Sequence, residues 1–490
     1  MRRREFLQKA GIAAATIGIG SGLFGKSRRK RPNILLYVVD DQGMGDAGCY
    51  GNSAIKTPGL DYLAKMGTRF DNAFCTSASC SASRSVILSG LQNHANGMFG
   101  HNHSVHHFRA FDNVKTLPVL LSDNGYKTVC MGKYHVGPKE VYKFDEFDDY
   151  SWIQNADGGW IPKETPEEMA ERCKSLIVNG DKQPFFLYFC TIAPHRPFVR
   201  TGIKPVDPGD VMVPDYLPDI PECRNELAKY YMSVERADAG LKRLTEILQE
   251  TGQWDDTLVI YCSDNGIAFP GGKTTTYDPG IKLPFVVRNP YAKNKGSSCD
   301  AMVSYVDITP TILDFAGIDY TTSYYDKVDV PDEITFIDGK PKNEKFHGRS
   351  FLPVMDIKHP KEWDEIYASH TFHEIYMYYP MRVVRERQYK LIWNIAYQLD
   401  YPFASDLLES ETWQGVLKNN MEYYGKRKVE DYLHRAEFEL YDIKNDPDEI
   451  NNLADDPKYR KEFERLVKKL KAFQIRTEDR WLNKWIGKEI

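Results

Sequence analysis

The sequence predicts an α/β fold in which a doubly wound sheet is flanked by helices and followed by a smaller α+β domain. Three observations predict it. Apolar, strand-like runs alternate with helix-like segments from residue 33 to about 318, as in doubly wound sheets. Polar residues gather just after several of these runs, where open parallel sheets bind ligands. The composition changes near residue 320, and the segments beyond it read as antiparallel strands and a helix.

The expected elements of the larger domain follow in chain order. The apolar run at 33–41 predicts a buried strand ending in two aspartates, and Thr57 and Pro58 open a helix that closes on Gly67. Within 114–137 an Asn-Gly turn separates a helix from a strand. The remaining runs alternate in the same way, with strands expected at 183–195, 256–266 and 283–290 and helices at 224–252 and 304–318.

The chain is expected to divide into three parts. Residues 1–31 form a targeting segment, residues 32–365 the large α/β domain, and residues 366–490 a C-terminal α+β domain. The stretch from 321 to 354 is polar and punctuated by Pro and Gly, which predicts a linker or surface crossover. Beyond it, 381–394 and 437–449 predict antiparallel strands, and 457–474 predicts a helix rich in Lys and Glu.

The first residues resemble an export signal. Arg3 and Arg4 precede Glu-Phe-Leu, as in the bacterial twin-arginine signal, although Arg2 stands where that signal usually has Ser or Thr. The apolar stretch at 10–24 is too short to span a bilayer comfortably. The resemblance implies a periplasmic or secreted protein with the twin-arginine machinery as a partner. An incidental basic tail is the alternative.

Composition excludes some classes of function. The net charge is −5, so no global basic field favours nucleic acid as a partner. The nine cysteines have no framework spacing and no C-x-x-C pair, which argues against a disulfide scaffold and against a zinc site of that type. Oligomeric state is open, and a homodimer is one option.

Hard oxygen ligands follow two of the strand-like runs. Asp40 and Asp41 end one run, and Asp264 and Asn265 end another. Oxygen ligands suit Ca²⁺ or Mg²⁺, and a cation would relieve the repulsion between three crowded carboxylates. Helix caps and turn formers are the alternative for each motif taken singly. Three more polar residues follow strand-like runs and are expected nearby, namely Lys133, His135 and His195.

Cys80 stands out in "TSASCSASRSVILSG", residues 76–90. A thiol at a helix N-terminus with Arg84 one turn on is expected to have a lowered pKa. A Cys-His nucleophile is the natural interpretation. A soft thiolate does not match a hard oxygen site, however, so the two inferences conflict if the sulfur is retained.

"CSASR", from Cys80 to Arg84, resembles the sulfatase signature C-x-P/A-S-R. "NILLYVVDDQG", "GKYHVG", "APHRPF", "SDNG" and "GGKTTTYDPGIKLP" resemble further sulfatase motifs in the family's order, and "ELYDIKNDPDEINNLA" resembles the family's C-terminal strand and turn. The resemblance implies an alkaline-phosphatase-like fold with a mixed sheet. It also implies that a maturation enzyme converts Cys80 to formylglycine (3-oxoalanine), whose hydrate offers hard oxygens and so removes the conflict.

The resemblance also implies roles for individual residues. Asp40, Asp41, Asp264 and Asn265 would hold one Ca²⁺ together with the modified Cys80. A hydroxyl of its hydrate would attack sulfur while the metal and cations offset charge on the sulfuryl oxygens. Arg84 would orient the hydrate, and Lys133, Lys273 and His195 would line the sulfate pocket. His195 would also protonate the leaving group, and His135 would remove a proton from the second hydroxyl of the hydrate.

A closer likeness is to the N-sulfoglucosamine sulfohydrolases. "GLQNHANGMFGHNHSVHHFRAFDNVKTLPVLL", "DNGIAFPGGKTTTYDPG" and "SHTFHEIYMYYPMRVVRERQYKLIWN" resemble that group. It implies hydrolysis of the N-sulfate of a non-reducing-end glucosamine in heparan-type saccharides. Two departures are Ala82, where proline is commoner, and Lys273, where the group leads us to expect arginine. An O-sulfatase acting on a glycosaminoglycan, a phosphoester or phosphonate hydrolase, and an inactive glycan-binding relative stay open as alternatives.

Substrate contacts are expected from two His-rich segments. Residues 101–107 hold four histidines, and residues 370–382 hold histidines, an acid and an arginine. Cations and hydrogen-bond donors suit anionic sugars. A polar loop or an adventitious metal site is the alternative for the first segment. The residues predicted to bind substrate are His101, His107, His373, Glu374 and Arg382, with His103, His106 and His370 as their neighbours.

Overall fold

A computed structural model describes residues 31–148, 152–154, 160–198, 202–321 and 346–485. Residues 32–490 cluster as one compact unit. The predicted export signal and most of the predicted linker at 321–354 lie outside the described residues. Among the described residues, no helix is both long enough and apolar enough to cross a bilayer.

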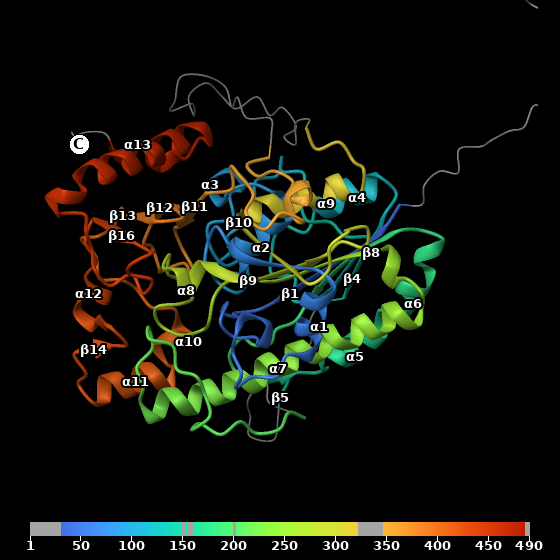
Figure 1. The fold of residues 1–490 in the computed structure, drawn as a ribbon, viewed down its shortest axis with the longest axis horizontal. Coiled ribbons are helices and arrows are strands. Elements are labelled where there is room, and N and C mark those ends of the chain that lie inside the picture. Colours follow the sequence, from blue (N-terminus) through green and yellow to red (C-terminus); the bar gives the residue numbers. More distant parts are fainter. Residues whose placement is uncertain (1–30, 149–151, 155–159, 199–201, 322–345, 486–490) are drawn as a thin grey trace, which may run out of the picture. The chain divides into compact units, whose positions relative to one another are not determined.

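An eight-stranded mixed sheet forms the centre of the larger domain (Figure 1). Its order is β10-β2-β9-β8-β1-β7-β3-β4, and β9 runs antiparallel to both β8 and β2. The strands are β1 (Asn33–Val39), β2 (Thr68–Phe74), β3 (Lys127–Gly132), β4 (Glu146–Asp148), β7 (Phe185–Cys190), β8 (Thr257–Ser263), β9 (Lys282–Arg288) and β10 (Ser297–Ser304). The predicted α/β class is confirmed.

Strand β1 is apolar from Ile34 to Val39 because helices cover both faces of the sheet. Ile34, Leu36 and Val38 pack in the same core as α2, α4 and α9, while Leu35 and Tyr37 pack with α1, α5 and α7. Figure 1 shows these two helix layers above and below the strands. The helices are α1 (Pro58–Met66), α2 (Cys80–Ser89), α3 (Asn93–Asn96), α4 (Leu117–Asp123), α5 (Pro166–Arg172), α6 (Lys174–Val178), α7 (Pro221–Glu250), α8 (Asp278–Ile281) and α9 (Ile308–Phe315).

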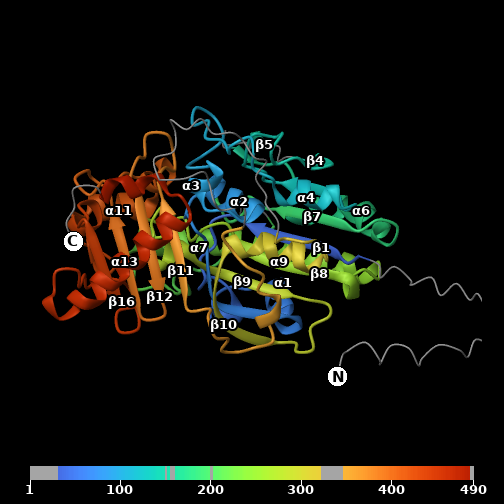
Figure 2. The ribbon, with the colours of Figure 1, turned by 90° about the horizontal axis from the view of Figure 1, so that it is seen from above.

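The C-terminal region is built on a four-stranded antiparallel sheet of order β11-β12-β13-β16 (Figure 2). Its longest helix, α13, packs Leu466 and Leu470 against Trp393 and Leu440 of the strands. Its elements are β11 (Glu365–His370), β12 (Met381–Glu386), β13 (Tyr389–Asn394), α10 (Ser405–Leu408), α11 (Glu411–Lys418), α12 (Val429–Leu433), β16 (Phe438–Asp442) and α13 (Arg460–Arg476). Short hairpins pair β5 (Trp152–Gln154) with β6 (Trp160–Pro162) and β14 (Tyr423–Tyr424) with β15 (Arg427–Lys428).

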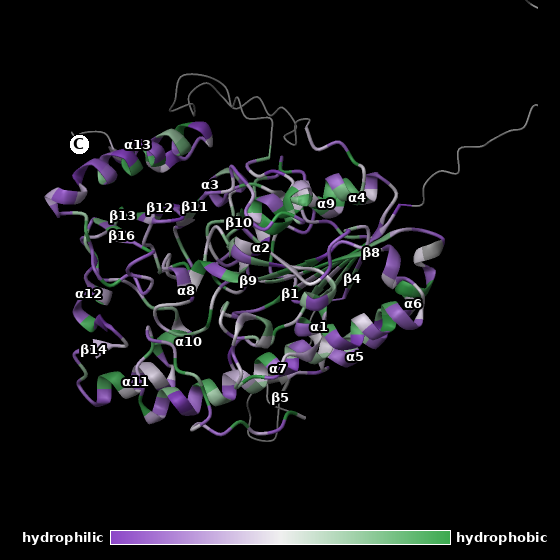
Figure 3. Ribbon diagram, in the orientation of Figure 1, coloured by the Kyte–Doolittle hydropathy of each residue, from purple (hydrophilic) through white to green (hydrophobic). Residues whose placement is uncertain are grey.

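Hydropathy follows this layering (Figure 3). The inner strands β8 and β9 are apolar, whereas α7 and α13 alternate between polar and apolar residues along their length. Sequence patterns missed β2, β10 and β11 because polar residues interrupt each of them. Strand β10 pairs only with β2 at the sheet edge, where fewer positions need to be apolar.

Candidate active site

The predicted acidic residues meet where two neighbouring parallel strands end. Val39 of β1 pairs with Ser263 of β8, so Asp40 and Asp264 emerge side by side. The backbone nitrogen of Asp41 donates to Asp264 Oδ1 at 3.2 Å. Asp41 has a φ of 69°, a left-handed conformation that is uncommon outside glycine and is found at functional turns. All of these carboxylates are fully buried.

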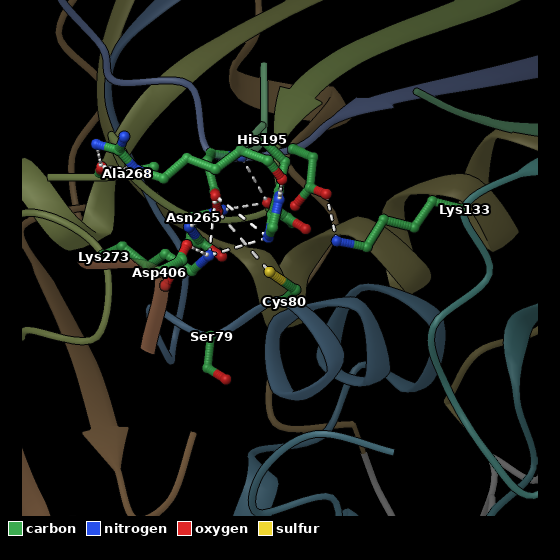
Figure 4. Close-up of polar contacts among 12 residues, drawn as sticks. Ser79, Cys80, Lys133, His195, Asn265, Ala268, Lys273 and Asp406 are labelled. Carbon is green, nitrogen blue, oxygen red and sulfur yellow. Dashed lines mark hydrogen bonds and ion pairs between the residues drawn. The ribbon is translucent and has the colours of Figure 1, made fainter. Parts of the chain in front are cut away.

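Cys80 is the first residue of α2 and faces this cluster (Figure 4). Its Sγ lies 3.8 Å from Asp41 Oδ1, and Asn265 Nδ2 donates to that same oxygen at 2.6 Å. One ligand atom from each of Asp40, Asp41, Cys80 and Asp264 falls within 4.8 Å of the others. The structure therefore brings together the predicted metal-ligating residues.

Three cations balance the carboxylates, of which Arg84 and Lys273 are buried and Lys133 is partly buried. Arg84 Nε donates to Asp264 Oδ2 at 2.8 Å, Lys133 Nζ forms an ion pair with Asp40, and Lys273 Nζ lies 2.9 Å from Asp41 Oδ2. Burial opposes ionisation of Asp40, but Lys133 and His195 more than offset it and hold the pKa of Asp40 below its ordinary value. Burial and the charge of Asp40 raise the pKa of Asp264 to about 6.

The predicted low pKa of the Cys80 thiol is wrong. Burial, followed by the charge of Asp40, raises its pKa well above the ordinary value, despite the helix N-terminus and nearby lysines. The free-energy penalty of burying a thiolate next to carboxylates is larger than the stabilisation that the helix dipole gives it. An unmodified Cys80 is thus a neutral thiol here, and a Cys-His nucleophile of the usual kind is not supported.

His195 has a partner in either protonation state. Its Nδ1 faces the carbonyl oxygen of Arg196, so this nitrogen carries a hydrogen. Its Nε2 lies 3.2 Å from Lys273 Nζ and 3.7 Å from Asp41 Oδ2. A neutral ring accepts from Lys273, and a protonated ring faces the carboxylate.

A cavity of about 670 Å³ lies beside the cluster. Its walls combine cations, imidazoles and a few acids, and come from both the larger domain and the C-terminal region. The lining residues that carry charge or an imidazole are His101, His103, Lys133, His135, Lys139, His195, Arg196, Lys273, His373, Glu374 and Asp406. Six of the predicted catalytic or substrate histidines and lysines therefore border one space.

Two predicted substrate residues lie elsewhere. Arg382 of β12 is buried and forms an ion pair with Asp479, with its guanidinium 4.6 Å from the ring centre of Trp481. His107 is exposed at a positive-φ position and does not line the cavity. The neighbouring His106 accepts from the backbone nitrogen of Ile375 at 3.2 Å. Arg382 therefore has a structural partner in place of a substrate.

Comparison with known proteins identifies the family. The sulfatase family model matches residues 32–318. The chain is 36% identical to human N-sulphoglucosamine sulphohydrolase over 94% of its own length and 93% of the human protein.

This chain belongs to the sulfatase family.

The sulfatase is also 29% identical to an ulvan-active sulfatase of Formosa agariphila, over 90% of its own length and 79% of that protein. A structure solved in complex with its substrate D-glucosamine-2-N, 6-O-disulfate matches with a TM-score of 0.64 and 22% identity, covering 94% of this chain and 100% of that one. This likeness shows the fold. The family assignment makes the protein a hydrolase of sulfuric esters or sulfamates.

The residues present fit the cation and the formylglycine that sulfatases use. Asp40 Oδ1 and Asn265 Oδ1 are buried oxygens with no hydrogen-bond partner among the described residues. Such oxygens are costly to leave unpaired, and a hard cation satisfies them. Cys80 lies beside them, so oxygen in place of its sulfur would complete a set of hard ligands.

Sequence reasoning missed residues of the sulfatase site that carry no motif. Asp406 Oδ2 lies 2.9 Å from Lys273 Nζ, and Ser79 Oγ lies 2.9 Å from His373 Nδ1. Glu374 accepts from Ser405 Oγ at 2.6 Å, at the start of α10. Of these residues, only Ser79 could have been found from the sequence, because it directly precedes Cys80.

Proposed function

We propose that this sulfatase hydrolyses the N-sulfate of a non-reducing-end N-sulfoglucosamine in saccharides derived from heparan sulfate or heparin. The supporting observation is the 36% identity, over nearly the whole of both chains, to a relative named for that reaction. The cavity is consistent with it, since its basic walls suit an anionic sugar.

Asp40, Asp41, Asp264 and Asn265 would hold one Ca²⁺ beside a formylglycine derived from Cys80. When present, these groups supply an oxygen nucleophile for sulfur and positive charge against the sulfuryl oxygens. Arg84 fixes the cluster, because it is fully buried and donates to both Asp264 and the carbonyl oxygen of Lys133, at 2.8 and 3.0 Å.

Lys133 and Lys273 would bind the sulfuryl oxygens. Figure 4 shows the two side chains on opposite sides of Cys80. Each ammonium already contacts one carboxylate of the cluster. Both lysines also line the cavity. Charge that develops on sulfate oxygens therefore meets cations already in place.

His195 gives a proton to the leaving nitrogen as the N–S bond breaks, so that the product leaves as a free amine. Expelling an unprotonated amide would be very costly. The ring is well placed for this task because Nε2 lies 3.2 Å from Lys273 Nζ and 3.7 Å from Asp41 Oδ2, at the edge of the cavity.

His135 would accept the proton that the second hydroxyl of the formylglycine hydrate must lose when sulfate is released. Burial, Lys133 and the neighbouring histidines hold the pKa of His135 well below its ordinary value. The ring is therefore neutral at neutral pH and has a lone pair free to accept a proton.

The test compares N-sulfated and 6-O-sulfated glucosamine as substrates of the purified protein. We expect free amine and sulfate from the first and little sulfate from the second. Release of sulfate from the O-sulfated sugar alone would establish the alternative, an O-sulfatase acting on a glycosaminoglycan. Lys273, where we expected arginine, is the observation that favours this alternative.

The state of Cys80 separates catalysis from glycan binding alone. Mass analysis of the 69–84 peptide from the native host should show loss of sulfur, and Cys80→Ala should abolish turnover. An unmodified Cys80 with full activity would contradict the mechanism, and an unmodified, inactive protein that still binds heparin saccharides would be a glycan-binding relative.

We also propose export to the periplasm or beyond by the twin-arginine route, after folding and modification. The support is the Arg3-Arg4 pattern of the sequence. Replacing both arginines by lysine should retain the modified protein in the cytoplasm. Unchanged export of that variant in cell fractionation would refute the route.

A further inference from the structure

Four histidines crowd one wall of the cavity. The ring centres of His101 and His373 are 3.9 Å apart, and those of His103 and His135 are 4.5 Å apart. His101 joins the two pairs, because its ring centre lies 4.9 Å from both His103 and His135. Two of the four come from the loop at 101–107, one follows β3, and one follows β11.

The ring nitrogens of three of these histidines converge, and no ion pair with a carboxylate holds any of the three among the described residues, although Glu374 lies near enough to act on the charge of His103. One nitrogen from each of His101, His103 and His135 lies within 4.8 Å of the others. His103 Nδ1 and His135 Nε2 are in direct contact. His101 Nδ1 and His135 Nδ1 are buried with no hydrogen-bond partner among the described residues, which is costly.

Neutral imidazoles are the form that binds metal. Burial, together with neighbouring charges, lowers the pKa of His103 to about 4 and those of His101 and His135 well below the ordinary value. At neutral pH no proton has to be displaced from any of the three.

We propose that His101, His103 and His135 form a second metal site, separate from the carboxylate cluster, which takes a borderline cation such as Zn²⁺. Three imidazoles suit Zn²⁺, Cu²⁺ or Ni²⁺, whereas Ca²⁺ prefers the oxygens around Cys80. Three protein ligands with a face open to a cavity leave a fourth position for water or a substrate oxygen.

Small ring rotations bring the ligands to the required spacing. A tetrahedral site with Zn–N bonds near 2.0–2.1 Å places its nitrogens about 3.3 Å apart, and the three nitrogens are already within 4.8 Å. His103 is exposed, so its side chain is free to adjust. The charge of Lys133 would repel a metal ion bound nearby, but the ion pair of its ammonium with Asp40 offsets that repulsion.

Occupation of this site inhibits hydrolysis. The consequence rests on the proposed function, in which His135 accepts a proton, since a bound metal takes the lone pair that the proton needs. The metal also occupies the cavity wall beside His373. Inhibition by zinc is therefore expected to weaken as the saccharide concentration rises.

Binding is measured apart from turnover. The full-length protein, saturated with Ca²⁺ so that the oxygen site is filled, is dialysed against Zn²⁺ and its metal content determined. We expect one zinc per chain for the wild type. His103→Gln should weaken zinc binding by more than about a hundredfold, because even outer-shell changes at metal sites cost roughly 10- to 100-fold. His107→Gln, in the same loop but outside the cavity, is the matched control and should bind zinc as the wild type does.

Co²⁺ in place of Zn²⁺ tests the site in the unaltered protein, independently of how the variants fold. Visible absorption bands typical of tetrahedral cobalt, lost on adding one equivalent of zinc, support the proposal. Absence of those bands, no bound zinc, or equal zinc affinity in wild type and His103→Gln each overturns it. Zinc bound through His103 in a protein that does not hydrolyse N-sulfoglucosamine would refute the proposed function and leave the site standing.

Discussion

At the residue scale, the charge on Lys273 is held by two acids from distant segments. Its ammonium lies 2.9 Å from both Asp41 and Asp406, and the side chain is 1% exposed. The charges of Asp406 and Asp41 raise the pKa of Lys273 well above its ordinary value despite burial. Lys273 therefore remains an ammonium that faces both the cluster and His195.

Asp406→Asn should lower kcat/KM by about tenfold, or about 1.4 kcal/mol, because Lys273 loses one of the two carboxylates that position it. Asp41 remains as a partner, so a complete loss is not expected. Steady-state kinetics on N-sulfoglucosamine measure the effect. Asp400→Asn, an exposed change nearby in the chain, is the control, and equal kinetics for both variants would contradict a positioning role for Asp406.

At the element scale, a buried ion pair joins β12 to the segment that follows α13. Arg382 Nη2 donates to Asp479 Oδ1 at 3.0 Å, and Gln474 Nε2 of α13 donates to Asp479 Oδ2 at 2.9 Å. Burial opposes ionisation of Asp479, but Arg382 more than offsets it and holds the pKa of Asp479 far below the ordinary value. The pair attaches the end of the helix to the sheet.

Asp479→Asn should destabilise the protein by about 3 kcal/mol, since it leaves a buried guanidinium without its counter-charge. Because the folded-state pKa of Asp479 is depressed, the stabilisation is complete above the ordinary Asp pKa and is lost as pH falls below it. Urea unfolding at pH 7 and near pH 3 should therefore show a smaller difference between wild type and variant in acid. A difference independent of pH would contradict the assignment.

At the scale of the whole molecule, both sheets contribute to one cavity. The larger sheet brings the carboxylate cluster together, and the C-terminal region adds His373, Glu374 and Asp406. The family model ends at residue 318, before these three residues. The cavity therefore depends on parts of the chain that the family match does not include.

Removing the Ca²⁺ that we propose for the carboxylate cluster should lower the melting temperature as well as activity. Without the ion, Asp40, Asp41 and Asp264 remain buried within a few ångströms of one another. At a calcium concentration 100 times Kd the ion contributes about 2.7 kcal/mol to folding stability. Calorimetry before and after chelation, with Ca²⁺ returned as the control, measures this. An unchanged melting temperature with unchanged activity would rule out a resident ion.

The sequence by itself determined which residues stand at strand ends. Asp40, Asp41, Asp264 and Asn265 were predicted together because parallel strands end at one edge of a sheet, and an apolar run shows where each strand stops. The position of Cys80 at the start of α2 also followed from local pattern. These predictions depend on short stretches of chain and on a rule shared by open sheets.

Only the tertiary structure decided which distant side chains meet. Asp406 contacts Lys273, His373 contacts His101, and Arg382 pairs with Asp479 and is not among the residues that line the cavity. No local pattern encodes these contacts, because they depend on how the C-terminal sheet packs against the larger domain. Burial likewise decided the pKa of the Cys80 thiol. Desolvation raises this pKa by more than the start of helix α2 lowers it, and only the helix start could be predicted from the sequence.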